Sequence, residues 1–181
     1  MHVKESKLKG LFIIEPTVFK DDRGYFFESF NSKLFKDKTG YSNNFVQDNE
    51  SKSQKNVLRG LHFQNPPFAQ GKLVRVIKGS VLDVAVDIRN NSSTYGEHIK
   101  LVLSEQNKTM MYIPEGFAHG FLTLENDTIF SYKCTNYYNK SSEDCILWND
   151  STLAIDWLID NPFLSEKDQL GKNFSSFVTK F

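Results

Sequence analysis

The alternation of side chains between residues 82 and 88 is the feature that most constrains the fold. Large apolar side chains occupy every second position there, and charged or small ones lie between them. Successive side chains of a strand point to opposite faces, so this pattern predicts a strand with two unlike faces. A β-branched stretch at 73–77 precedes it, and Lys78-Gly79-Ser80 has the composition of a short hairpin turn. We therefore expect 73–77 and 82–88 to form an antiparallel pair.

Short apolar runs recur along the chain and favour an all-β fold. They are bounded by turn-forming residues and lie at 11–14, 25–30, 99–103, 110–113 and 128–133. Many short strands with regular turns are typical of a sandwich or barrel.

Helical signals are short and sparse. One helix is predicted after Asn31-Ser32, ending near Thr39-Gly40, and another begins near Ser165. We find no repeat and no linker that would mark a second domain, so we predict one domain over residues 1–181 with short accessory helices. The last ten residues are expected to be loosely held.

Charge and cysteine content limit the classes of partner and compartment. The 22 basic and 22 acidic side chains cancel, so no broad field attracts nucleic acid or an anionic membrane. No apolar run approaches the ~20 residues that cross a bilayer, and the N-terminus lacks the apolar core of a signal peptide. Cys134 and Cys145 form no C-x-x-C pair, which is typical of free thiols in a reducing compartment. We expect a cytoplasmic protein that binds neither nucleic acid nor membrane.

A basic cluster around residue 60 is the first candidate site. Arg59 and His62 lie three positions apart, and Lys72 follows shortly after. In a regular strand Arg59 and His62 would face opposite ways, so Gly60 is predicted to mark a bulge or bend that re-aims one of them. The alternative is a surface arginine beside a half-buried histidine whose hydrogen bonds are satisfied.

Residues 113–121 hold a turn and then His119, a pattern similar to the second half of the cupin signature. The first half of that signature supplies a His-x-His pair and a carboxylate, whereas Phe63 and Gln64 follow His62 here. Because this ligand set is incomplete, we expect no metal. Histidines with nearby cations suit proton transfer next to an oxyanion instead. Tyr132, on a predicted strand, is a candidate acid, although a lone strand tyrosine more often serves packing.

Several motifs occur in order between Phe19 and Asp168. They are Phe19-x-Asp21-x-Arg23-Gly24 continuing to Phe27-Glu28, Gln47-Asp48-Asn49 with Ser51 and Ser53, Val57-Leu58-Arg59-Gly60-Leu61-His62-Phe63-Gln64, Gln70-Gly71-Lys72-Leu73-Val74-Arg75, Asp83-Val84-Ala85-Val86-Asp87-Ile88-Arg89, residues 113–121, and Leu164-Ser165-Glu166-Lys167-Asp168. Together they resemble the dTDP-4-dehydrorhamnose 3,5-epimerase family. The resemblance implies a cofactor-free, cupin-type antiparallel jelly roll, a double-stranded β-helix barrel. It also implies a homodimer whose N-terminal strand exchange brings residues of one subunit to the other's site.

The resemblance further assigns catalytic roles by position. It makes His62 the general base, oriented by Asp168, and Tyr132 the general acid. Lys72 and His119 would stabilise the enolate oxygen. Two alternatives stay open from the residues themselves. Asp83, on a mixed strand face, could be the partner of the His62 imidazole, and Asp168 lies where a helix-capping acid would lie.

Contacts to the nucleotide and sugar follow from the same resemblance. The expected substrate-binding residues are Arg23, Glu28, Gln47, Asp48, Asn49, Arg59, Lys72, His119, Tyr138, Glu143 and Lys167. Arginine suits a diphosphate because its planar fork matches phosphate geometry. Either Tyr137 or Tyr138 could stack on the thymine, since neighbouring strand residues point oppositely, and Tyr138 is our choice. Arg23 as a solvated turn charge and Glu28 as an outward strand residue are the plainer readings.

The implied reaction converts dTDP-4-dehydro-6-deoxy-D-glucose to dTDP-4-dehydro-L-rhamnose through an enolate, for surface polysaccharide such as lipopolysaccharide. Protons on carbons 3 and 5 are acidified by the 4-keto group, and a base and an acid on opposite faces invert each centre. The alternatives are a single-centre epimerase of a related nucleotide sugar and a non-catalytic sugar-nucleotide-binding cupin. The chain departs from the family pattern at Leu158, which replaces a common proline. The sequence therefore does not predict the conformation of the loop that precedes Asp168.

Overall fold

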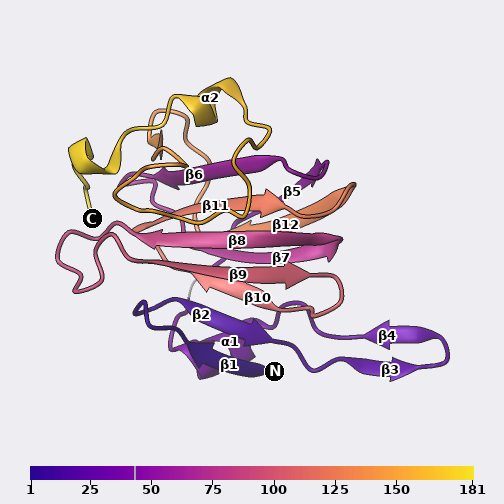
Figure 1. The fold of residues 1–181 in the computed structure, drawn as a ribbon. Coiled ribbons are helices and arrows are strands. Elements are labelled where there is room, and N and C mark those ends of the chain that lie inside the picture. The colour runs from indigo at the N-terminus through magenta and orange to yellow at the C-terminus, as the bar shows by residue number, and fades with distance from the viewer. Residues whose placement is uncertain (43) are drawn as a thin grey trace.

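Two antiparallel sheets packed face to face make up the body of the computed structural model, which describes residues 1–42 and 44–181 (Figure 1). The first sheet has the order β1 (His2–Glu5), β2 (Phe12–Glu15), β10 (Met110–Ile113), β7 (Lys72–Lys78), β12 (Thr128–Cys134) and β5 (Gln47–Ser53). The second has the order β13 (Glu143–Cys145), β6 (Leu58–Gln64), β11 (Phe117–Thr123), β8 (Ser80–Asp87) and β9 (His98–Ser104). The predicted all-β, cupin-like jelly roll is thus confirmed.

The remaining elements are short and peripheral. A hairpin of β3 (Phe19–Asp21) and β4 (Gly24–Phe26) extends away from the two sheets (Figure 1). Helix α1 (Ser32–Thr39) begins at Asn31, whose side chain accepts a hydrogen bond from the Leu34 amide, and α2 (Glu166–Gln169) begins at the capping residue Ser165. Both predicted helices are therefore confirmed. A single 3₁₀ turn, η1 (Phe174–Ser176), follows, and none of the described helices is long and apolar enough to cross a bilayer.

The expected pairing of 73–77 with 82–88 is wrong. Strands β7 and β8 follow one another in sequence but lie in opposite sheets. Strand β7 pairs with β10 and β12, and β8 pairs with β11 and β9. Gly79, with φ of +78°, turns the chain from one sheet to the other, and a Cβ there would lie 2.5 Å from Thr128 Oγ1. The local sequence of a tight turn does not distinguish a hairpin from this crossing.

Apolar packing occurs on both faces of β8. One face lies between the sheets, where Val81 and Ala85 pack with Phe121 of the neighbouring β11 and with Phe130 of β12 in the facing sheet. The other face packs under the C-terminal segment, which crosses this sheet (Figure 1) and supplies Trp157, Phe174 and Phe177 to the core. The expectation of a loosely held C-terminus is therefore wrong, because Phe174 and Phe177 are buried.

A bulge in β6 positions the candidate site. Along the β6–β11 pair, His62 lies opposite His119 and Arg59 lies opposite Phe121, so β6 carries one extra residue between these two pairs. Residues opposite one another share a face, and Phe121 and His119 are both on the inner face, where each ring lies against Phe130. Arg59 and His62 thus belong to the same side, as the position of Gly60 predicts. A Cβ at Gly60 would lie 2.4 Å from the Gly120 Cα.

Candidate active site

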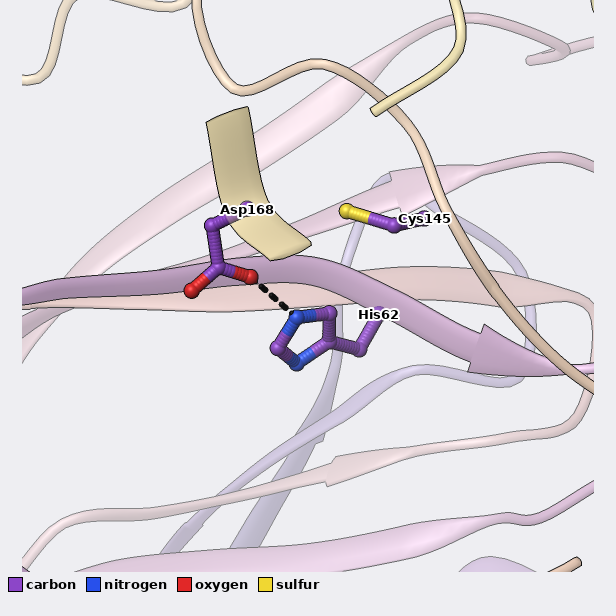
Figure 2. A group of neighbouring side chains, drawn as sticks. All are labelled: His62, Cys145 and Asp168. Carbon is purple, nitrogen blue, oxygen red and sulfur yellow. Dashed lines mark hydrogen bonds and ion pairs between the residues drawn. The ribbon is translucent and has the colours of Figure 1, made fainter. Parts of the chain in front are cut away.

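His62 of β6, in the second sheet, and Asp168 of α2 are in direct hydrogen-bonding contact (Figure 2). The His62 Nε2 atom contacts Oδ1 of Asp168, and Oδ2 of the same carboxylate accepts a 2.7 Å hydrogen bond from the Ser165 hydroxyl. Burial raises the pKa of Asp168, but the hydrogen bonds from His62 and Ser165 outweigh it and hold the pKa below its usual value. An ionised carboxylate only accepts, so Nε2 carries a proton, and in the neutral ring Nδ1 is the acceptor.

His119 forms a second, deeper imidazole–carboxylate pair. Its Nε2 lies 3.1 Å from both oxygens of Asp83, and both side chains are buried. Burial lowers the pKa of His119 by more than the Asp83 carboxylate raises it, and Lys72 and His62 add to the lowering, so the ring is neutral near pH 7. Asp83 thus partners His119, and Asp168 partners His62. The alternative in which Asp83 holds His62 does not occur in this structure.

Lys72 and Tyr132 come from the sheet that faces His62. The Lys72 Nζ lies 3.5 Å from the His62 carbonyl oxygen, and burial lowers the pKa of this ammonium group. Burial raises the pKa of Tyr132, and a hydrogen bond from Asn49 acts in the opposite direction. Because β12 and β6 belong to opposite sheets, the Tyr132 phenol and the His62 imidazole approach the space between them from two sides.

One pocket gathers many of the predicted residues. It is lined by Gln47, Asn49, His62, Phe63, Gln64, Gln70, Lys72, Tyr132, Tyr138 and Glu143. Asp168 contacts His62 behind it, and Lys167 forms an ion pair with Glu143 at its edge. The Tyr138 hydroxyl donates to Glu143 at 2.9 Å, whereas Tyr137 does not line the pocket. Burial raises the pKa of Glu143, but its bonds with Lys167 and Tyr138 lower it by more.

Besides the buried His119 and the bordering Asp168 and Lys167, four predicted residues do not line this pocket. Arg23 sits in the β3–β4 hairpin with 90% of its side chain exposed and pairs with Asp21. Glu28 follows that hairpin and accepts a hydrogen bond from Asn31. Asp48 lies between the pocket residues Gln47 and Asn49 of β5, so its side chain points to the opposite face of the sheet, where it forms an exposed ion pair with Lys133. Arg59 faces the same side as His62, but its guanidinium donates to Ser53.

Two further side chains were not predicted to take part in a site. The Ser51 Oγ atom is buried and has no hydrogen-bond partner among the described residues. It lies on the pocket side of β5, because it alternates in register with Asn49 and Ser53. Cys145 lies opposite His62 in the β13–β6 pair. Spacing from Asn49 could have indicated Ser51, but nothing in the sequence pairs 145 with 62.

The loop before Asp168 places this carboxylate against His62 despite its departure from the family pattern. Leu158 adopts φ of +63°. A proline ring fixes φ near about −65°, so proline does not fit this backbone. Proline is thus excluded at 158 in this conformation, and the contact between Asp168 and His62 is in place.

The fold and these side chains define a jelly-roll protein of the cupin-like class that carries paired acid–base groups. Sequence comparison then identifies the family. The family model described as dTDP-4-dehydrorhamnose 3,5-epimerase matches residues 5–176. The chain is 54% identical over 169 residues to the dTDP-4-dehydrorhamnose 3,5-epimerase of Salmonella typhimurium, which covers 93% of this chain and 92% of the relative. The chain belongs to the dTDP-4-dehydrorhamnose 3,5-epimerase family.

Solved structures agree with this assignment. The Legionella pneumophila dTDP-6-deoxy-D-glucose-3,5-epimerase, solved with dTDP-4-keto-L-rhamnose, matches with a TM-score of 0.94 at 46% identity over 98% of this chain and 94% of that one. A 3′-monoepimerase from Streptomyces bikiniensis, solved with dTDP-quinovose, matches with a TM-score of 0.89 at 29% identity over 94% and 86%. The fold is therefore shared by enzymes that differ in how many centres they invert.

Proposed function

We propose that this chain is a dTDP-4-dehydrorhamnose 3,5-epimerase that inverts carbons 3 and 5 of dTDP-4-dehydro-6-deoxy-D-glucose. The observation that carries the proposal is the His62–Asp168 pair, which lies across the pocket from Tyr132 with the Lys72 ammonium group between the sheets. Inversion needs a base on one face of the sugar and an acid on the other. Groups borne by two opposed sheets meet that need.

His62 acts as the base in this scheme. Its Nδ1 removes a proton from the carbon next to the 4-keto group, and Asp168 stabilises the imidazolium that forms. Tyr132 then delivers a proton to the opposite face, and its hydrogen bond with Asn49 orients the phenol. After the first inversion the His62 imidazolium releases its proton to water and the Tyr132 phenolate takes one up. The same two groups then serve the second carbon when the sugar ring is repositioned.

Lys72 stabilises the enolate oxygen directly, and His119 acts through Asp83. A buried ammonium group acts in a low-dielectric setting, where its attraction for a developing oxyanion is stronger than in water. His119, held neutral by burial, donates its Nε2 proton to Asp83 and keeps only an acceptor at Nδ1, so it fixes the Asp83 carboxylate near Lys72 and does not donate to the enolate oxygen. The unpartnered Ser51 hydroxyl is available to a sugar hydroxyl, since a buried polar atom without a partner is costly unless a ligand satisfies it.

The nucleotide is bound by groups around the pocket and by a second subunit. Gln47, Tyr138, Glu143 and Lys167 lie at the pocket or its edge and contact the thymidine diphosphate. Support for a homodimer comes from the projecting β3–β4 hairpin, where Phe19 and Phe26 are 62% and 66% exposed. Large apolar side chains gathered on a small hairpin are typical of an interaction surface. In this dimer, Arg23, Glu28 and Asp48 complete the partner's site.

A mixed-subunit experiment tests this part. Arg23→Ala and His62→Ala variants are each expected to lose activity. If Arg23 acts in the partner's site, a heterodimer holds one site with both His62 and Arg23 intact. Mixing the two inactive variants after mild dissociation then restores activity. Two inactive variants that stay inactive in a verified heterodimer would place Arg23 in its own subunit's site or outside catalysis.

The activity itself is tested by solvent exchange. The protein is incubated with dTDP-4-keto-6-deoxyglucose in deuterated water, and deuterium at carbons 3 and 5 is followed by NMR, with the product trapped by a reductase and NADPH. Label at both carbons and a rhamnose-configured product support the double epimerase. Label at one carbon supports the single-centre reaction, of which the structural match to the Streptomyces 3′-monoepimerase is an example. No label at either carbon refutes both.

A further inference from the structure

Cys145 lies next to the His62–Asp168 pair, and the proposed reaction does not use it. Cys145 is directly opposite His62 in the β13–β6 pair. Its sulfur, a ring nitrogen of His62 and a carboxylate oxygen of Asp168 all lie within 4.8 Å of one another. In Figure 2 the Cys145 sulfur points toward the region occupied by the Asp168 carboxylate and the His62 ring.

We propose that His62, Cys145 and Asp168 form a binding site for Zn²⁺ and similar thiophilic divalent cations, and that occupancy of this site inhibits the enzyme. Thiolate, imidazole and carboxylate are the three donor types that zinc takes in proteins. The site lies on residues from three separate segments, β6, β13 and α2. It is an inhibitory site and not a cofactor site.

The spacing of the donor atoms is close to that of a zinc site. Zinc binds sulfur at about 2.3 Å and nitrogen or oxygen at about 2.0–2.2 Å, so two ligands of one tetrahedral ion lie about 3.4–3.6 Å apart. The three donor atoms here lie within 4.8 Å of one another, so side-chain rotations that bring them closer by up to about 1 Å complete the site. Of the three donors His62 is the most exposed, at 28% of its side chain, whereas Asp168 and Cys145 are buried.

The charges of the site also suit a divalent cation. Burial raises the pKa of the Cys145 thiol to about 12, so without metal the sulfur is protonated and inert. Zinc displaces the Cys145 proton to solvent, and the resulting thiolate and the Asp168 carboxylate together neutralise the ion. Lys167 is paired with Glu143 and is not free to compete for the carboxylate. Binding therefore releases one proton for each zinc ion.

Inhibition follows from the tautomer of His62. Without metal, Asp168 keeps the ring proton on Nε2 and leaves Nδ1 as the base. Zinc takes the lone pair of Nε2, so the ring proton moves to Nδ1 and His62 stays neutral overall. Nδ1 then donates and no longer accepts. The metal thus removes the base without altering the fold, and only this inhibitory consequence rests on the proposed function.

The test begins without substrate. The purified protein is titrated with Co²⁺, which replaces Zn²⁺ in such sites, and the near-ultraviolet thiolate-to-cobalt charge-transfer absorption is recorded. Zn²⁺ is then added to displace the cobalt, and proton release is followed with a pH indicator. We expect one metal ion and one proton per chain in the wild type. Cys134→Ser, at the other free cysteine, keeps the absorption, whereas Cys145→Ser and Cys145→Ala lose it.

Inhibition is measured next on the same variants. Zn²⁺ is expected to inhibit the wild type and Cys134→Ser alike. It should inhibit Cys145→Ser at concentrations higher by about 100-fold, because losing even an outer-shell partner weakens metal binding by about 10–100-fold. Cys145→Ser should keep its activity without metal. Absence of the charge-transfer absorption in the wild type, or equal zinc sensitivity of the wild type and both Cys145 variants, refutes the site. The cobalt titration needs no turnover, so its result is independent of the proposed reaction.

Discussion

Replacing Asp168 by asparagine tests whether this carboxylate acts through its charge. The substitution keeps the size of the side chain and removes the negative charge next to the His62 ring. Two opposite charges about 4 Å apart interact by about 4 kcal/mol at an effective dielectric constant near 20. If His62 becomes an imidazolium in the transition state, that loss corresponds to a decrease in kcat of about 10³-fold, at about 1.36 kcal/mol per factor of ten.

The assay is the NMR exchange experiment, with kcat taken from product formation and the fold checked by thermal unfolding. Asp144→Asn is the matched control, because Asp144 lies beside the dyad in β13 but pairs with Lys172. This ion pair is partly solvated, with Lys172 58% and Asp144 18% exposed, and it does not involve His62, so the control should retain activity within about threefold. An Asp168→Asn enzyme that is folded and keeps more than about a tenth of wild-type kcat would show that the charge does not support His62 in the transition state.

Three further predictions follow from buried groups and from the bulge. Lys72→Met should abolish activity and raise the free energy of unfolding by about 1 kcal/mol or more, because burial disfavours the charge of Lys72 and lowers its pKa. The free energy of unfolding is measured by urea titration, and a variant less stable than the wild type would contradict this prediction. Asp87 is buried, yet its hydrogen bonds with Arg89, Ser92 and Thr94 overcome the effect of burial and lower its pKa. Its contribution to stability is present above its unfolded pKa, about 3.9, and is lost as the pH falls through the folded value. The stability of the wild type should therefore fall more steeply than that of Asp87→Asn below about pH 4, and parallel curves would exclude this role. Gly60→Ala should cost about 3 kcal/mol or more, since the new Cβ meets the Gly120 backbone at 2.4 Å. Gly24 has a similar positive φ, but a Cβ there would have no atom within 4 Å, so Gly24→Ala carries the backbone strain without the clash. Equal losses of stability in the two variants would refute the role of the clash.

The sequence predicts those features that depend on local geometry. The bulge at Gly60 follows from parity, because Arg59 and His62 lie an odd number of positions apart and a regular strand would separate them. The limits of α1 follow from Asn31 and Gly40, which cap its ends.

Features that depend on contacts between distant segments were harder to predict. The turn at Gly79 looks the same whether β7 and β8 pair or separate, and the partners that decide it, β10, β11 and β12, come later in the chain. The contact between His62 and Asp168 spans 106 positions and was indicated only by the family resemblance. Cys145 lies next to His62 because β13 pairs with β6, and no local sequence pattern predicts this pairing.

The helix that carries Asp168 is only four residues long, and this has a consequence for how activity is lost. A single turn is not stable in water by itself, so Glu166–Gln169 keeps its shape because it is docked on the barrel and capped by Ser165. The strands that carry His62, Lys72 and Tyr132 are each held by neighbours on both sides. Opening of the segment around α2 therefore needs less free energy than unfolding of the barrel. On warming, the base should lose its orienting carboxylate while both sheets are still intact, and catalysis should fade before the protein melts.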